Sequence, residues 1–264
     1  MKKYIKVILS SITVLVMVTN SHADEANNLA IKDTVKLLNL ASTQKMISQR
    51  LAKDYLYIGN RVALSKASRQ FDKSLLVLSD IQKQLVESIN DEEIINLLSF
   101  VDMSSEEFKE VSQEAYNLDN AQLILDLSES MLEGSEYVVS TLKGTLNIDE
   151  SNMAVIASRQ SVLAQRIAKY YIAYQSGIKD KNTVEQMQNA VKVFTAAQKT
   201  LMENKTNTPE LNRKLNDIAR LWKVVYKFYL NIEKGGLPLI VFNTTDKITK
   251  KMNEITAMYT DLYK

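Results

Sequence analysis

One helical motif occurs twice in the chain, at a spacing of 116 residues. Residues 41–55 read ASTQKMISQRLAKDY and residues 157–171 read ASRQSVLAQRIAKYY, so eight of fifteen positions are identical. Self-similarity at a fixed spacing indicates a duplicated structural unit. Each copy opens a stretch of similar length, and we therefore expect two related units of roughly 115 to 120 residues.

Few helix-breaking residues interrupt the chain, which has six glycines and two prolines among 264 residues. Apolar residues recur at the spacing of one helix face, as in Phe71, Leu75, Leu78 and Leu85. Stretches rich in glycine, proline and asparagine separate such runs and predict eight helices, four in each half of the chain. Four amphipathic helices can bury their apolar faces together. We therefore predict an all-α fold with two tandem, antiparallel, up-down four-helix bundles, over residues 24–147 and 148–264.

The junction between the two units allows two arrangements. The fourth helix can continue into the fifth as one long central helix, or the two helices can be separated by a break. Gly144, Asn147 and Asp149 lie at this point and favour the break.

The N-terminus has the pattern of a secretory signal. Three lysines lie among the first six residues, an uncharged apolar run follows over residues 7–19, and small side chains precede Asp24. We predict a signal peptide over residues 1–23, cleavage after Ala23 and a periplasmic mature protein. An uncleaved membrane anchor is the alternative, but the 13-residue run is shorter than the roughly 20 residues that a spanning helix needs.

The mature chain lacks the side chains that most catalytic and metal sites use. The sequence has no cysteine, and its one histidine, His22, lies in the predicted signal peptide. This excludes cysteine nucleophiles and His/Cys metal sites. Loss of the three signal lysines leaves 30 basic against 31 acidic residues, without the basic stripe that nucleic acid requires. We expect a binding or sensing protein rather than an enzyme, with no cofactor, no metal and no nucleic-acid partner.

Gln44 and Gln160 occupy equivalent positions in the two motif copies. At about 100° per residue, Gln44 lies on the same helix face as Ile47 and Leu51. A buried amide without partners costs about 1–3 kcal/mol, so both glutamines need hydrogen bonds. Either they bond to a neighbouring helix as part of the structure, or they line a ligand pocket between helices.

Arg50 and Arg166 lie about 100° from the centre of the apolar face, at its edge, whereas Lys53 and Lys169 lie on the far side of the helix. An arginine at such an edge can bind a planar oxyanion through two parallel hydrogen bonds. The alternative is an arginine that extends along the surface and pairs with a carboxylate.

Residues 39–53, which read NLASTQKMISQRLAK, resemble the signature of PilJ-type sensor domains. Residues 156–169, which read IASRQSVLAQRIAK, resemble it again. These domains form the N-terminal part of type IV pilus chemotaxis transducers, and their relatives include the periplasmic nitrate-sensing domain of the NarX kinases. The specific resemblance covers the motif in each copy; elsewhere only the helical pattern agrees.

The resemblance implies a periplasmic four-helix bundle whose first helix, often at a homodimer interface, binds a small anion such as nitrate or nitrite. Arg50 and Arg166 match the second arginine of the signature. The first basic position, which the family associates with the anion, is Lys45 in one copy and the uncharged Ser161 in the other. Arg159 lies about 200° from Ser161 around the helix and is not expected to replace it.

Two hypotheses about function follow. The first is an exported sensor or binding protein for a small ligand, with nitrate or nitrite as candidate oxyanions, which passes its state to a membrane receptor or kinase. Its site would contain Gln44, Lys45, Arg50, Gln160 and Arg166. The second is a ligand-free scaffold or adaptor that binds a receptor or associates with itself as a homodimer. Under either hypothesis, the two motif helices can pair within one chain and imitate the dimer of the family.

Overall fold

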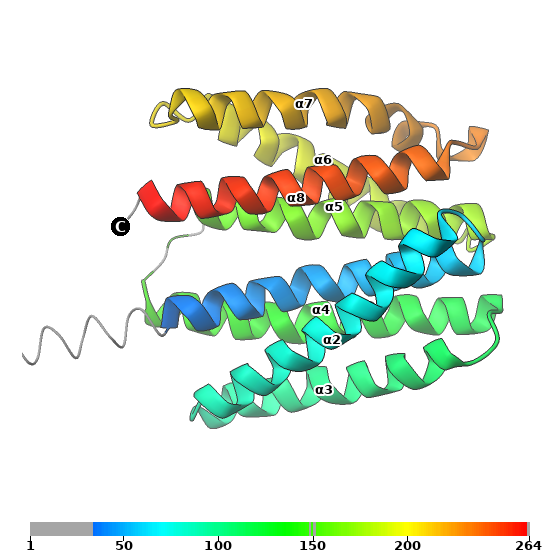
Figure 1. Ribbon diagram of the computed structural model, residues 1–264, viewed down its shortest axis with the longest axis horizontal. Helices are drawn as coiled ribbons and strands as arrows, with labels where there is room; N and C mark the ends of the chain where they lie inside the picture. The colour runs from blue at the N-terminus through cyan, green and yellow to red at the C-terminus, as the bar shows by residue number, and fades with distance from the viewer. Residues whose placement is uncertain (1–33, 148, 150–151, 263–264) are drawn as a thin grey trace, which may run out of the picture.

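The computed structural model describes residues 34–147, 149 and 152–262. The predicted signal peptide lies outside these residues. Within them, the chain forms eight α-helices and no strand (Figure 1). The prediction of an all-α fold is therefore confirmed.

Each unit contributes four helices. The first unit contains a helix over residues 34–59, followed by α2 (Leu64–Ser88), α3 (Glu92–Gln113) and α4 (Leu118–Thr145). The second unit contains α5 (Met153–Ser176), α6 (Lys181–Glu203), α7 (Pro209–Leu230), a short 3-10 helix (Ile232–Lys234) and α8 (Pro238–Leu262). The two copies of the motif lie in the 34–59 helix and in α5, and we call these the motif helices.

Side-chain caps and special residues fix several helix ends. The Asp91 carboxylate accepts a hydrogen bond from the backbone amide of Ile94 at the start of α3. Thr208 caps α7 in the same way. Pro209 fits the first turn because backbone amides there have no hydrogen-bond acceptor within the helix, so the missing N–H of proline costs nothing. Gly177 ends α5 with a φ of 114°, a conformation that glycine adopts more easily than other residues.

The two units pack against each other along their inner helices. The 34–59 helix, α4, α5 and α8 lie between the outer hairpins α2–α3 and α6–α7 (Figure 1). Five buried residues of the second unit belong to the hydrophobic core of the first: Val162, Ile172, Ala173, Ile178 and Phe242. Both motif helices therefore lie at the centre of the molecule, covered on their own-bundle side and on the side of the other unit.

The two motif helices run parallel and in register. Their N-terminal halves line a common cavity, to which one contributes Ser42 and the other Ser158, the residue 116 positions later. Near their C-terminal ends, the Asn60 amide donates a hydrogen bond to the Ser176 hydroxyl, and these residues are again 116 positions apart. Equivalent residues of the two copies thus meet, as they do across the two-fold axis of a homodimer.

The junction between the units is a reversal of the chain. Helix α4 ends at Thr145 and α5 begins at Met153, and the two helices run in opposite directions (Figure 1). The predicted break is confirmed, and the alternative of a shared central helix is wrong. In the part of the chain that the structure describes, no helix combines the length and the apolar character needed to cross a bilayer.

Candidate ligand-binding cavity

Gln44 is fully buried and both ends of its amide are bonded. Its Nε2 donates to Gln82 Oε1 at 2.6 Å, and its Oε1 accepts from the Ser135 hydroxyl at 3.0 Å. Gln82 in turn donates to the carbonyl of Leu98 at 2.7 Å. The chain of bonds connects the 34–59 helix with α2, α3 and α4, which matches the structural alternative for this glutamine.

Gln160 also holds its own bundle together. It is fully buried, and its Nε2 donates to the carbonyl of Phe194 on α6 at 3.0 Å. One helix further out, Gln198 donates to the carbonyl of Leu215 at 3.1 Å, which repeats the bond that Gln82 makes 116 residues earlier. The duplication therefore extends beyond the motif to the buried glutamines of α2 and α6.

Lys53 and Lys169 connect the two units. Both are fully buried, because the far side of each motif helix faces the other unit. Lys53 Nζ donates to Asp246 of α8 at 2.8 Å and to Gln70 at 3.0 Å. Lys169 Nζ donates to Glu129 of α4 at 2.5 Å. Each unit thus sends one lysine to a carboxylate of the other.

Arg166 shares the Glu129 carboxylate with Lys169. Its guanidinium pairs with Glu129 and donates to Gln186 Oε1 at 2.9 Å. Burial alone would raise the pKa of Glu129, but the two cations lower it. Arg50 lies at the equivalent position of the first unit, and its Nε is buried without a hydrogen-bond partner. Neither Arg50 nor Arg166 lines the cavity between the two units or the smaller cavity beside it.

A cavity of about 1000 Å³ lies between the two units, at the N-terminal ends of the motif helices. Its lining combines four cations with one carboxylate: Lys36 and Lys45 from the 34–59 helix, Lys143 and Glu136 from α4, and Arg159 from α5. Most of the remaining lining is apolar or carries a hydroxyl or amide group. Lys36, Lys45 and Arg159 alone outnumber the Glu136 carboxylate, and this excess of positive charge favours an anionic occupant.

Lys45 is a buried cation of this cavity. It pairs with Glu136, and the side chain of Lys45 is 8 % exposed against 53 % for Glu136. Burial lowers the pKa of Lys45, Glu136 opposes that effect, and the positive charges of Lys143 and Arg159 lower it further. A second anion at this place would stabilise the charged form of Lys45.

Arg159 lines the cavity, although it was not expected to replace Ser161 as the basic residue of the second motif. Arg159 is an exposed residue of α5, and its positive charge is near enough to contribute to the lowered pKa of Lys45. Ser161, at the signature's basic position, lines a smaller adjoining cavity of about 390 Å³ and donates to Asn253 Oδ1 at 2.5 Å.

The structure brings only part of the predicted site together. Lys45 lines the cavity, whereas Gln44, Gln160 and Arg166 bond to neighbouring helices and Arg50 lies elsewhere. Arg159, Lys143 and Lys36 were missed. Arg159 occupies the position equivalent to Thr43 of the first motif helix, 116 residues earlier. Both residues line the cavity between the units, so the internal repeat relates them.

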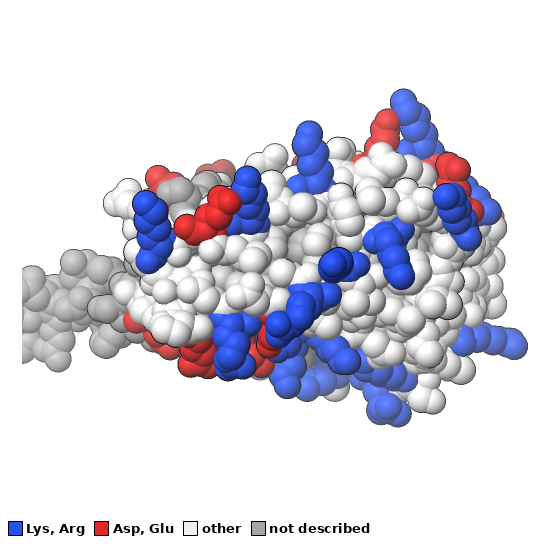
Figure 2. Space-filling model, turned by 90° about the horizontal axis from the view of Figure 1, so that it is seen from above, with Lys and Arg blue, Asp and Glu red and all other residues white. Residues whose placement is uncertain are grey.

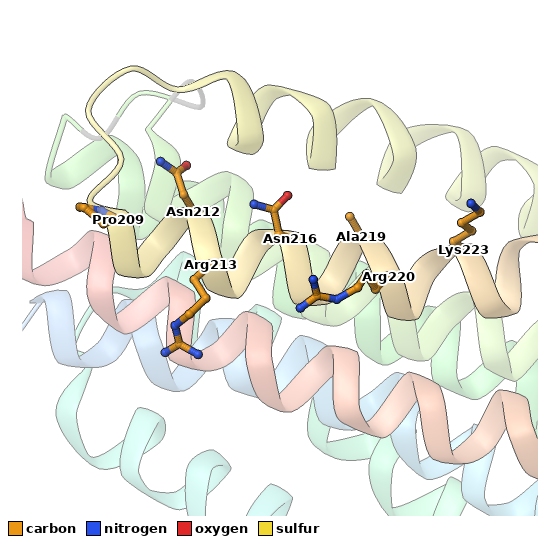
Figure 3. Close-up of a pocket in the computed structure, with 7 residues that line it drawn as sticks. All are labelled: Pro209, Asn212, Arg213, Asn216, Ala219, Arg220 and Lys223. Atoms are coloured by element: carbon orange, nitrogen blue, oxygen red, sulfur yellow. The ribbon is translucent and has the colours of Figure 1, made fainter.

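A second hollow lies on the outer face of α7 (Figure 3). All seven of its lining residues come from that one helix, and they include Arg213, Arg220 and Lys223. Figure 2 shows this side of the molecule, where lysine and arginine side chains are spread over the surface. Arg213 pairs with Glu210 and Arg220 pairs with Asp217. This hollow is an exposed helix face and not an enclosed site.

Comparison of the chain with protein-family models, with curated proteins and with solved structures gives no match.

Proposed function

We propose that this chain is an exported, periplasmic binding or sensor protein that holds an anionic small molecule between its two units. The observation that supports the proposal is the cavity between the motif helices, where four cations accompany one carboxylate. Buried pockets with a few convergent polar groups are the usual place for a small ligand. The proposal is one of binding and sensing, without catalysis.

Two of the cations, Lys45 and Arg159, would hold the anionic group. Glu136 is about half exposed, so it can turn to water when the carboxylate, nitrate or other oxyanion of a ligand takes its place beside Lys45. Arg159, from the other motif helix, can bind two oxygens of the same group through its planar guanidinium. A ligand would thus contact both units at once, and its binding would change how firmly they are held together. A membrane receptor or kinase would be the partner that detects this change.

Calorimetric titration of residues 24–264 with nitrate, nitrite, acetate and benzoate, at constant chloride, tests the proposal. We expect saturable binding that weakens at least tenfold in Lys45→Met and in Arg159→Gln. The matched control is Lys199→Met on α6, whose side chain is 75 % exposed and does not line the cavity. Absence of binding by every anion would contradict the proposed function.

The scaffold hypothesis is the second candidate, and the bonds of the motif itself favour it. Gln44, Gln160 and Arg166 are engaged with neighbouring helices, and Lys53 and Lys169 connect the units. The repeated residues therefore stabilise the fold through contacts within the protein, and these contacts need no ligand. If no anion binds and cross-linking detects a stable homodimer or a receptor complex, the scaffold becomes the better description.

A further inference from the structure

The cavity between the units is much larger than a small oxyanion. A water molecule takes up about 30 Å³ of liquid, and nitrate, with four atoms, displaces only a few waters. The cavity measures about 1000 Å³, at the upper end of the range for pockets that enclose an organic ligand. Nitrate alone would leave most of this space to water in contact with apolar walls.

The wall of the cavity is largely apolar, and apolar residues come from three helices. They include Val35, Leu38 and Leu40 from the 34–59 helix, Val139 from α4, and Val155 and Val162 from α5. Water in contact with such surface is replaced favourably by hydrocarbon, at about 25 cal/mol for each Å² removed from water. The cations favour an anionic group, and the apolar wall favours a ligand that also carries hydrocarbon.

The register of the helices gives the cavity a long axis. Lys45 pairs with Glu136 near one end. Helix α4 runs antiparallel to the 34–59 helix, so Val139 and then Leu146 lie progressively closer to Val35 at the other end (Figure 1). The helix rises about 15 Å between Val35 and Lys45. An elongated molecule can therefore place a charged group beside Lys45 while its body lies along the apolar wall.

We propose that the ligand is an amphiphilic organic anion, with one carboxylate or sulfonate group and an unbranched alkyl or aryl-alkyl body. The inference rests on the proposed function and specifies its ligand class. The anionic head lies between Lys45 and Arg159, and the hydrocarbon contacts Leu38, Val139 and Val155. Lys36 lies on the same wall and adds positive charge that favours an anion.

The test is a series of dissolved alkyl carboxylates of increasing length, titrated calorimetrically below their micelle concentration into residues 24–264. We expect affinity to rise about fourfold with each added methylene, the value for complete burial of that group, until the chain fills the cavity. Val155→Ser should reduce the gain per methylene, whereas Arg159→Gln should weaken all members of the series alike. Val224→Ser on α7, 45 % exposed, is the matched control and should change nothing.

Each other outcome has a distinct meaning. Binding of acetate or nitrate as tightly as the long carboxylates would overturn the ligand class and leave the anion-binding function intact. No binding of any anion would overturn both. Equal binding of decyltrimethylammonium, or equal binding by all cavity variants, would show adsorption to the surface and overturn the inference. Binding to phosphatidylglycerol vesicles without binding of dissolved carboxylates would assign the affinity to a membrane surface and overturn it as well.

Discussion

Asp54 and Lys53 are adjacent and fully buried, but only the lysine side chain has hydrogen-bond partners. Lys53 directs its hydrogen bonds to Gln70 and Asp246, and neither carboxylate oxygen of Asp54 has a hydrogen-bond partner, although Lys53 Nζ lies 3.2 Å from one of them. Burial raises the pKa of Asp54 to about 7; Lys53 and Arg50 oppose this effect, whereas Asp246 adds to it. A protonated Asp54 is thus the favoured form in the folded protein below neutral pH.

Stability should fall as the pH rises from about 4 to about 7 because of Asp54. The unfolded carboxyl ionises near pH 4 and the folded one near pH 7, so the folded state holds one more proton across this window. The free energy of unfolding should therefore fall by up to about 1.4 kcal/mol for each pH unit in this window. Asp54→Asn removes this titration while keeping the shape. Urea unfolding of both proteins across the window should show the wild type losing stability relative to the variant; a constant difference would contradict the raised pKa.

Lys53→Met should lower the free energy of unfolding by about 3 kcal/mol, because it leaves Asp246 with one partner fewer in a place where both charges are shielded from water. Lys66 supplies the matched control. It pairs with the same carboxylate at 3.1 Å, but its side chain is 46 % exposed, so Lys66→Met should cost less than about 1 kcal/mol. Urea unfolding measures both. Equal losses would show that burial of the lysine is not what gives the Lys53 bridge its strength.

At the scale of the helix, the motif helices differ from the ordinary surface helix of a bundle. Periodicity correctly placed Gln44 and Gln160 on the core side, and the scarcity of glycine and proline correctly indicated eight long helices. The same pattern placed Lys53 and Lys169 on the far side, where they are buried. Periodicity identifies the faces of a helix but not the neighbour that covers each face, so the bridges between units could not be derived from it.

Helix α4 approaches α3 closely at Gly134. A methyl group added there would lie 2.6 Å from a methyl group of Val101, whose branched side chain has little freedom to move. Gly134→Ala should therefore destabilise the protein by about 1–3 kcal/mol through overpacking, despite the better helix propensity of alanine. In the same helix, Gly144 has nothing within 4 Å of the added carbon, and Gly144→Ala should stabilise by up to about 1 kcal/mol. Thermal or urea unfolding that gives both changes the same sign would contradict this contrast.

At the scale of the molecule, the candidate site lies between the units rather than within one of them. The sequence pattern placed a candidate anion site on each motif helix separately, and of those residues Lys45 lines the cavity. Arg159 was set aside because it lies about 200° from Ser161 around the helix, whereas the cavity is lined by the helix face that meets the other unit. The resemblance to a dimeric sensor did suggest paired motif helices, and the structure places the two copies side by side with Asn60 and Ser176 in contact.

The shared core and the reciprocal lysine bridges should make the two units unfold together. Trp222, the only tryptophan, lies in the core of the second unit and stacks on Phe194 at 4.1 Å between ring centroids, so its fluorescence reports on that unit alone. Leu98 is fully buried on α3, in the first unit. Leu98→Ala should cost about 2–5 kcal/mol and lower the melting temperature by about 2–4 °C per kcal/mol.

If the molecule is one cooperative unit, Trp222 fluorescence and far-UV circular dichroism should report the same midpoint in the wild type, and Leu98→Ala should lower both midpoints equally. The remote reporter would then respond because the loss of the first unit exposes Phe242 and the other residues of the second unit that lie in its core. A Trp222 midpoint that stays unchanged while the circular dichroism becomes biphasic would show two independent units. In that case a ligand bound between them would have to create the coupling, rather than modify a coupling already present in the free protein.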